Sequence, residues 1–349
     1  MPQDFESFFN KKRVLITGGA GFIGSTLVRR LLTKSTAFVF NLDKLGYASS
    51  LKSIDEVIFK SNNQTKARYK FFNIDLCNFQ KTQKAINDSK PDIIFHLAAE
   101  SHVDSSIIKP SIFVESNING TFNLLESVKN YFKTLDERKR NSFRFHHIST
   151  DEVFGSLGFE GYFDENSPYK PNSPYSASKA ASDHLVMAWR KTFKLPTLIT
   201  NCSNNYGPWQ YPEKLIPKAI NNALKGKKIP LYGNGENVRD WLFVEDHIDA
   251  LLVVAQNGIV GESYCIGGNE EKKNKDVLLK ICEVLDSVYP SNKPYSNLIE
   301  NVCDRKGHDF RYAINSNKIK KELKWKPKIN FEVGIKNTIN WYLKYHKFC

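Results

Sequence analysis

Apolar, β-branched runs recur along the chain and alternate with segments of helical periodicity. The runs are continuous rather than alternating with polar residues, which is typical of strands covered on both faces of a sheet. Their alternation with helices predicts a doubly wound parallel α/β sheet of about seven strands joined by right-handed crossovers. The predicted strands are residues 13–19, 38–43, 69–75, 92–99, 143–150, 196–203 and 263–268.

A change in amino-acid composition near residue 204 predicts a second structural region. From there the chain is rich in Pro, Gly and Asn and holds shorter helical stretches. We therefore expect a large α/β domain over residues 1–203 and a smaller mixed α/β lobe over residues 204–349. The segment of about 240–268 is expected to return to the large sheet, because it ends in another apolar strand pattern.

Composition places the chain among ordinary folded proteins, with 41% hydrophobic and 25% charged residues among 349. The net charge of +13 comes from lysines mixed with acids and asparagines, so we expect no nucleic-acid partner. No apolar run approaches the ~20 residues of a membrane span, and the N-terminus lacks a signal-peptide pattern. These features predict a cytoplasmic protein that does not insert into membranes.

The six cysteines show no CxxC spacing and no density typical of a disulfide scaffold. We therefore expect reduced thiols and no metal site.

The stretch "VLITGGAGFIGSTLVRRLL" places Gly18, Gly21 and Gly24 between the first predicted strand and the first helix. Glycines let the backbone approach a pyrophosphate, and the helix N-terminus offers N–H groups and partial positive charge. Asp43 ends the second strand, where an acid suits the ribose hydroxyls and repels a 2′-phosphate. The pattern predicts a Rossmann-type domain that binds NAD rather than NADP, although the adjacent Lys44 leaves the choice open.

Tyr175 and Lys179 are four residues apart in "YSASK", so they would lie side by side on one helix face. A phenol with an ordinary pKa near ~10 is a weak base at neutral pH, but an adjacent ammonium and a cationic nicotinamide favour the phenolate. Tyrosine could then remove a hydroxyl proton while hydride leaves the same carbon.

Several motifs together resemble the extended short-chain dehydrogenase/reductase superfamily, and within it the family of dTDP-glucose 4,6-dehydratases. The resemblance covers about residues 12–345. It rests on TGGAGFIG, YSASK, AAESHVD (98–104), STDEVFG (149–155), NCSNNYGPWQYPEKLIPK (201–218), LYGNGENVRDWLFVEDH (231–247) and DRKGHDFRYAI (304–314). It implies a lyase that uses NAD, takes dTDP-glucose as substrate in deoxysugar synthesis such as that of rhamnose, and forms a homodimer.

The adjacent carboxylates Asp151 and Glu152 follow an apolar strand, where a solvated turn would be the ordinary interpretation. A 4,6-dehydratase needs one ionised carboxylate to remove the C5 proton and one protonated carboxyl to release the C6 hydroxyl. Neighbours within a strand face opposite sides, but a turn at the strand end would let both acids point at the sugar. The resemblance implies that Glu152 is the C5 base, Asp151 the C6 acid, Tyr175 the C4 base and Thr150 a partner of the C4 oxygen, with Lys179 beside Tyr175.

The resemblance also implies two sets of binding residues. The cofactor would contact Gly18, Gly21, Phe22, Ile23, Gly24, Asp43, Lys44, Asp75, Leu76, Ala98, Ala99, Ser101, Ser116, Tyr175, Lys179 and Asn205. The nucleotide sugar would contact Ser101, Thr150, Asn204, Lys214, Leu215, Tyr232, Arg239, Asn274, Arg305 and His308, and the ring of Trp209 or Tyr211 could stack on its base.

Other functions stay open at this point. A UDP-glucose 4,6-dehydratase or a UDP-sugar 4-epimerase would share the architecture, but an epimerase needs no acid and base at C5 and C6. A non-catalytic dinucleotide- or RNA-binding protein would not need Tyr175, Lys179, Asp151 and Glu152. Lys306, Asn269 and Glu270 depart from the usual family pattern and could alter nucleotide affinity.

Overall fold

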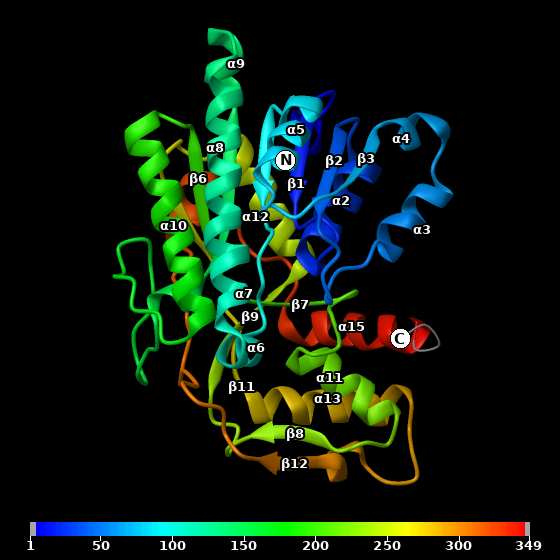
Figure 1. The fold of residues 1–349 in the computed structure, drawn as a ribbon. Coiled ribbons are helices and arrows are strands. Elements are labelled where there is room, and N and C mark those ends of the chain that lie inside the picture. The colour runs from blue at the N-terminus through cyan, green and yellow to red at the C-terminus, as the bar shows by residue number, and fades with distance from the viewer. Residues whose placement is uncertain (1–4, 346–349) are drawn as a thin grey trace.

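The computed structural model describes residues 5–345, in which a seven-stranded parallel sheet forms the core (Figure 1). The strand order is β10-β6-β5-β4-β1-β2-β3. The doubly wound α/β fold predicted from the apolar runs is confirmed, and each predicted strand supplies one strand of this sheet. The strands are β1 (Arg13–Thr17), β2 (Phe38–Asp43), β3 (Tyr69–Asn73), β4 (Ile93–His96), β5 (Arg144–Thr150), β6 (Thr197–Cys202) and β10 (Ser263–Ile266).

Helices cover both faces of the sheet, which explains why its strands are apolar throughout. Successive residues of β1 divide between two hydrophobic clusters: Val14 and Ile16 pack in one, and Leu15 packs in the other. The first face is covered by α1 (Phe5–Phe8), α2 (Phe22–Lys34), α3 (Lys52–Lys60) and α12 (Val244–Asn257). The second is covered by α5 (Phe79–Ser89), α8 (Gly120–Lys133) and α10 (Pro174–Phe193).

Short helices lie in the connections of the large sheet. They are α4 (Asn63–Ala67), α6 (Val103–Ile108), α7 (Pro110–Phe113), the π-helical η1 (Val114–Asn119), α9 (Glu137–Ser142) and the 3-10 turn η2 (Asp151–Phe154). Later in the chain, α14 (Asn317–Leu323) packs against β10. The turn η2 follows β5 directly, so the strand direction changes at the position of the two adjacent acids.

A smaller lobe packs below the carboxyl edge of the sheet in the view of Figure 1. Its strands β7 (Asn204–Tyr206), β9 (Val238–Phe243) and β11 (Glu271–Lys273) form one small sheet, and β8 (Ile229–Tyr232) pairs with β12 (Ile299–Val302). Helices α11 (Leu215–Leu224), α13 (Asn274–Val288) and α15 (Phe331–Tyr345), with the 3-10 turn η3 (Tyr295–Leu298), surround its own hydrophobic cluster.

The chain crosses between the two parts more than once. Strand β9 lies in the small sheet of the lobe, whereas α12 and β10 lie against the large sheet, where β10 pairs with β6. The division at residue 203 therefore stays a prediction about domains, with the second crossing made by the segment from Val244 to Ile266.

Among residues 5–345, every helix is too short or too polar to span a lipid bilayer. Cys77, Cys202, Cys265, Cys282 and Cys303 are free thiols, and Cys349 lies outside the described residues. The described residues hold no group of His, Cys, Asp and Glu arranged to bind a metal ion.

Candidate active site

The turn between β1 and α2 depends on glycine because the backbone approaches itself closely there. Gly18 has a φ of +70°, and a Cβ on it would lie 2.6 Å from the backbone nitrogen of Ala98. A Cβ on Gly24 would overlap the carbonyl oxygen of Gly18. Gly21 is the N-cap residue of α2 and has no side chain to cap the helix. The first turn of α2 is therefore exposed to a ligand approaching from the loop.

Asp43 ends β2 and is tied to this loop. One carboxylate oxygen accepts a hydrogen bond from the Ala20 N–H at 3.0 Å, and the other accepts from the Leu45 N–H and the Ser49 hydroxyl. The neighbouring Lys44 turns to another partner, because its ammonium lies 2.9 Å from a carboxylate oxygen of Glu100. Asp43 is therefore held against the glycine turn, while the Lys44 charge is already paired with Glu100.

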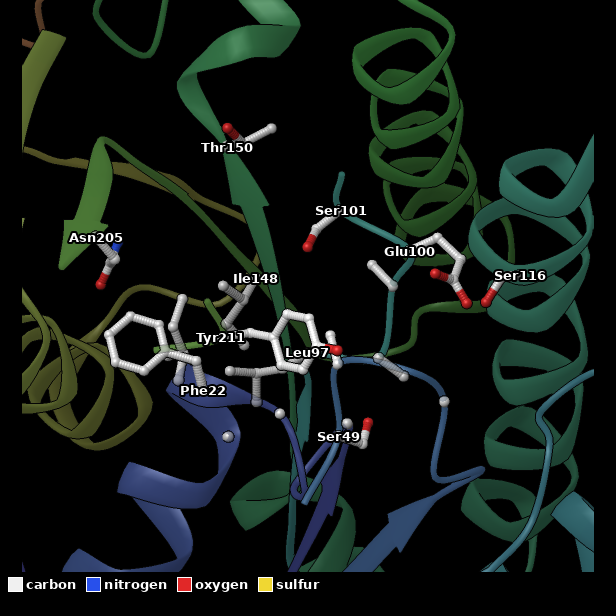
Figure 2. Close-up of a pocket in the computed structure, with 18 of the residues that line it drawn as sticks. Phe22, Ser49, Leu97, Glu100, Ser101, Ser116, Ile148, Thr150, Asn205 and Tyr211 are labelled. Atoms are coloured by element: carbon white, nitrogen blue, oxygen red, sulfur yellow. The ribbon is translucent and has the colours of Figure 1, made fainter. Parts of the chain in front are cut away.

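A first cavity of about 310 Å³ runs from this loop to the end of β5. All the residues that were predicted to contact the cofactor line this cavity, from Gly18 and Asp43 to Tyr175, Lys179 and Asn205. Figure 2 shows how Phe22, Leu97, Ser101, Ile148 and Thr150 surround one space although they come from different strand ends. Their contact with a cofactor stays a prediction.

A second cavity of about 180 Å³ lies between the sheet and the lobe. It is lined by the residues predicted to contact the nucleotide sugar: Ser101, Asn204, Lys214, Leu215, Tyr232, Arg239, Asn274, Arg305 and His308. Thr150 lies in the first cavity instead. Ser101, Glu152, Asn204 and Lys214 line both cavities, so the two spaces meet beside the acid pair.

The end of β5 presents the two acids to this junction. The Thr150 hydroxyl accepts a hydrogen bond from the Glu152 N–H at 3.3 Å and donates to a carboxyl oxygen of Asp151 at 3.2 Å. Thr150 thus caps the turn η2, and the chain changes direction after the strand. Asp151 is buried, and its second carboxyl oxygen has no hydrogen-bond partner among the described residues.

The surroundings of the two acids are unequal. Burial raises the pKa of Asp151 well above its usual value, and the charges of Glu152 and Asp240 raise it further. Burial also raises the pKa of Glu152, but the positive charges of Arg305, Arg239 and Lys214 oppose that increase. Three cations oppose the increase at Glu152, whereas at Asp151 Arg239 opposes it, so the surroundings favour a proton on Asp151 over one on Glu152.

Helix α10 begins with Ser173 and Pro174, which set the position of Tyr175. The Ser173 hydroxyl accepts from the Ser176 N–H at 3.0 Å in a capping box. Lys179, one turn later, donates from its Nζ to the carbonyl oxygen of Ile148 at 2.9 Å, which joins α10 to β5. The side chains of Tyr175 and Lys179 are buried and line the first cavity.

The protein groups around Tyr175 oppose formation of the phenolate, and the contribution of a nicotinamide charge stays a prediction. Burial raises this pKa well above its ordinary value, and the Glu152 charge adds to the increase, whereas a hydrogen bond with Thr150 opposes it. Burial also lowers the pKa of Lys179. The protein groups alone therefore keep Tyr175 protonated, because the desolvation of a phenolate costs more than its neighbours recover.

The cations of the second cavity are held by backbone and by acids. Arg239 donates to the carbonyl oxygens of Val238 at 2.7 Å and Asp309 at 2.9 Å. Arg305 lies 3.6 Å from a carboxylate oxygen of Asp104, and the hydroxyl of Tyr232 donates to the same carboxylate at 3.2 Å. This arrangement concentrates positive charge at the cavity and suits a ligand with phosphate groups.

Some cavity residues were missed by the sequence analysis. Glu100 and Asp104 lie inside the quoted motif AAESHVD, which could have indicated them. Tyr47 and Glu213 come from distant loops and meet through a hydrogen bond of 3.0 Å, for which the sequence holds no signal.

Neither Trp209 nor Tyr211 lines the second cavity, and stacking of one of these rings on the substrate base stays a prediction. Trp209 packs against Trp341, with ring centroids 4.9 Å apart, and Tyr211 lines the first cavity.

Comparisons with known proteins agree with this geometry. Residues 15–338 match the family model described as GDP-mannose 4,6 dehydratase. The chain is 51% identical over 340 residues to the dTDP-glucose 4,6-dehydratase of Shigella flexneri, covering 95% of this chain and 92% of the relative.

Solved structures of dTDP-glucose 4,6-dehydratases are also similar. The enzyme from Bacillus anthracis in complex with NAD has a TM-score of 0.82 and 43% identity, with 96% of this chain and 97% of that chain covered. The enzyme from Streptomyces venezuelae, also with NAD bound, has a TM-score of 0.85 and 39% identity, with coverages of 96% and 98%. This chain therefore belongs to the GDP-mannose 4,6 dehydratase family of extended short-chain dehydrogenases/reductases and, within it, to the dTDP-glucose 4,6-dehydratases.

Proposed function

We propose that this protein converts dTDP-glucose into dTDP-4-keto-6-deoxy-glucose by oxidation at C4, loss of water across C5 and C6, and reduction at C6. The observation that carries this proposal is the position of Asp151 and Glu152, which adjoin Tyr175 in the first cavity where it meets the second. A 4-epimerase has no step that needs these two carboxyl groups.

The residues of the first cavity fit NAD. Gly18 and Gly24 keep the backbone free of side chains where a pyrophosphate approaches α2, and Asp43 faces the ribose position. Lys44 is engaged by Glu100, so it offers no unpaired charge to a 2′-phosphate. When bound, NAD accepts the hydride from C4 of the sugar and returns it to C6.

Oxidation at C4 requires a base for the hydroxyl proton, and Tyr175 has this role. Thr150 holds the C4 oxygen by a hydrogen bond, and the ammonium of Lys179 stabilises the phenolate that Tyr175 forms. Because the protein, with Lys179 in place, raises the pKa of Tyr175, the positive charge of the oxidised cofactor is also needed to form the phenolate.

Elimination then uses the two acids in different protonation states. The C4 ketone acidifies the C5 hydrogen, and Glu152 removes it as a proton while the C5 electron pair expels the C6 oxygen. Asp151 protonates that oxygen, so water leaves. The unequal pKa shifts of the pair suit this division. Positive charges of the lobe offset part of the effect of burial at Glu152, whereas burial and neighbouring negative charges raise the pKa of Asp151.

The second cavity holds the nucleoside diphosphate. Arg239, Arg305 and Lys214 supply positive charge for the phosphates, while Asn204, Tyr232, Asn274 and His308 supply polar contacts.

A homodimer would form through an exposed apolar face on α6, α7, η1, α8 and α10, which lie side by side in Figure 1. Ile108 is 75% exposed there, and Ile112, Val114, Phe122 and Phe193 are exposed beside it. Phe122 also contacts Trp189, with ring centroids 5.8 Å apart. Such a patch is typical of an interface between protein copies.

The dimer predicts a defined effect of charge on this face. We expect Phe122→Glu to convert the dimer to a monomer in light scattering, since a buried unpaired carboxylate opposes association. Phe59→Glu, at a side chain that is 84% exposed on α3, should leave the dimer intact. A wild-type protein that is monomeric at all concentrations would contradict the dimer.

The activity is tested with separate incubations of dTDP-glucose and UDP-glucose. We expect the 4-keto-6-deoxy product from dTDP-glucose, with UDP-glucose turned over more slowly. Deuterium placed at C4 should appear at C6 of the product, because the same hydride is returned. Formation of a 4-epimer, or of a keto sugar that retains its C6 hydroxyl, would show that the proposed reaction is wrong.

Cofactor binding should depend on the space at Gly24. We expect Gly24→Ala to purify with little NAD, because the added methyl overlaps the Gly18 carbonyl and displaces the loop. Gly21→Ala, whose Cβ would lie 3.3 Å from the same oxygen, should lose less, and Gly158→Ala, with no atom within 4 Å, should behave as wild type. The NAD content per chain and the melting temperature are measured; equal NAD content in all three variants would contradict the assignment.

Neutralising Asp151 and neutralising Glu152 should impair different steps of the reaction. Asp151→Asn should slow formation of the product by ~10²–10⁴-fold but retain exchange of the C5 hydrogen in heavy water, since Glu152 is intact. Glu152→Gln should lose both product formation and C5 exchange.

Adjacent carboxyl groups titrate as a coupled pair, so the comparison is made at several pH values. Glu160→Gln, at an exposed acid on the following loop, is the matched control and should turn over normally. Identical behaviour of the Asp151 and Glu152 variants at every pH would disprove the division of roles.

A further inference from the structure

Asp183 is a buried carboxylate that the mechanism above does not use. It lies on α10 one turn beyond Lys179, so Tyr175, Lys179 and Asp183 follow one another at intervals of four residues on the same helix. Both Lys179 and Asp183 are buried. A charged side chain in such a place is costly unless it is paired or hydrogen-bonded.

Donors from β5 and a neighbouring loop surround the Asp183 carboxylate. The Nε2 of His147 lies 3.0 Å from one oxygen, and the Ser149 hydroxyl donates to the other at 2.7 Å. The Tyr169 hydroxyl donates to that second oxygen at 2.9 Å. His147 and Ser149 share one face of β5, because side chains alternate along a strand, and α10 packs on this face.

Lys179 meets β5 between these two residues. Its Nζ donates to the carbonyl oxygen of Ile148, while the side chains of His147 and Ser149 on either side bind Asp183. One strand segment thus fixes both the ammonium and the carboxylate of α10. The contact between His147 and Asp183 is a hydrogen bond rather than an ion pair, since burial lowers the pKa of His147 to about 4.

We propose that Asp183 is a positioning residue for catalysis, whose charge keeps Lys179 protonated beside Tyr175. This inference rests on the proposed role of Tyr175 as the C4 base and of Lys179 as its cationic neighbour. Asp183 does not touch the reacting atoms; it acts through the ammonium.

The other titratable groups around Lys179 do not supply the negative charge. His96 on β4 and His147 on β5 are neutral at neutral pH, because burial lowers the pKa of both. Cys202 on β6 is a neutral thiol, since burial raises its pKa to about 12.

Asp183 itself stays ionised. Burial opposes ionisation, but the interactions with His147, the charge of Lys179 and the hydrogen bond from Ser149 together lower the pKa of Asp183 below its usual value. Of the groups whose charges act on Lys179 in the described structure, Asp183 is therefore the one that is negative at neutral pH. Without it, the buried ammonium would lose its proton at lower pH.

The test compares removal of the charge with removal of one hydrogen bond to it. In Asp183→Asn, the alkaline limb of the kcat profile should move to lower pH by about one unit or more, with KM for dTDP-glucose unchanged. Above the shifted limb, kcat should fall by about tenfold or more. Tyr169→Phe removes a hydroxyl from the same carboxylate but leaves its charge, so it should reduce thermal stability without moving the limb.

A spectroscopic measurement separates this inference from the proposed activity. The ¹⁵Nζ resonance of Lys179, assigned by its absence in Lys179→Met, is titrated in the wild-type protein and in Asp183→Asn without turnover. We expect a charged lysine at neutral pH in the wild type and a lower midpoint in the variant. The titration reports on Asp183 even if dTDP-glucose is not the substrate, and a neutral Lys179 in the wild type contradicts the proposal even if the variant does not fold.

The proposal fails if Lys179 of the wild type is neutral at neutral pH, or if Asp183→Asn leaves the Lys179 midpoint in place. It also fails if Asp183→Asn and Tyr169→Phe move the alkaline limb equally, because the carboxylate would then act only as a structural link between α10 and β5.

Discussion

Parallel pairing of β1, β2, β4 and β5 brings the carboxyl ends of these strands to one edge of the sheet, and the rest of the site depends on this constraint. The glycine turn, Asp43, Ser101 and the Thr150 turn each follow one of these strand ends. Their order along the edge decides which part of a ligand each can meet. The glycine turn between β1 and α2 lies at one end of the first cavity. Asp151 and Glu152 lie where that cavity meets the second.

Within this edge, electrostatics assigns different tasks to similar groups. Asp151 and Glu152 are sequence neighbours and burial raises the pKa of both, yet the positive charges of Arg305, Arg239 and Lys214 oppose that increase at Glu152. The arginines of the lobe line the second cavity and also favour the ionised form of Glu152. Under the proposed function, the same positive charges would couple substrate binding to proton transfer.

Helix α10 is the second element that joins structure to chemistry. Its capping box sets where Tyr175 begins the first turn, and its contacts with β5 hold Lys179 and Asp183 below it. The strand contributes its backbone to the ammonium and its side chains to the carboxylate. A change at His147, which does not line the first cavity, would therefore reach that cavity through Asp183 and α10.

The sequence by itself determined the parallel α/β architecture. Its continuous apolar runs alternate with helical segments, which is typical of parallel strands covered by helices on both faces. It also indicated the glycine turn with Asp43 and the helix that carries Tyr175 and Lys179. These signals are local, because a turn or one helical repeat involves only residues close in sequence. The residues that the resemblance implied for the cofactor line the first cavity, and those implied for the nucleotide sugar line the second. Thr150, which was implied for the sugar, lies in the first cavity.

Other properties were decided only by the tertiary structure. The pairing of Lys44 with Glu100, the meeting of Tyr47 with Glu213 and the donors around Asp183 join segments that are far apart in the chain. The balance of effects on the Tyr175 pKa likewise depends on the fold. Spacing shows that Lys179 is near, but the cost of desolvating a phenolate depends on how completely the surrounding chain excludes water.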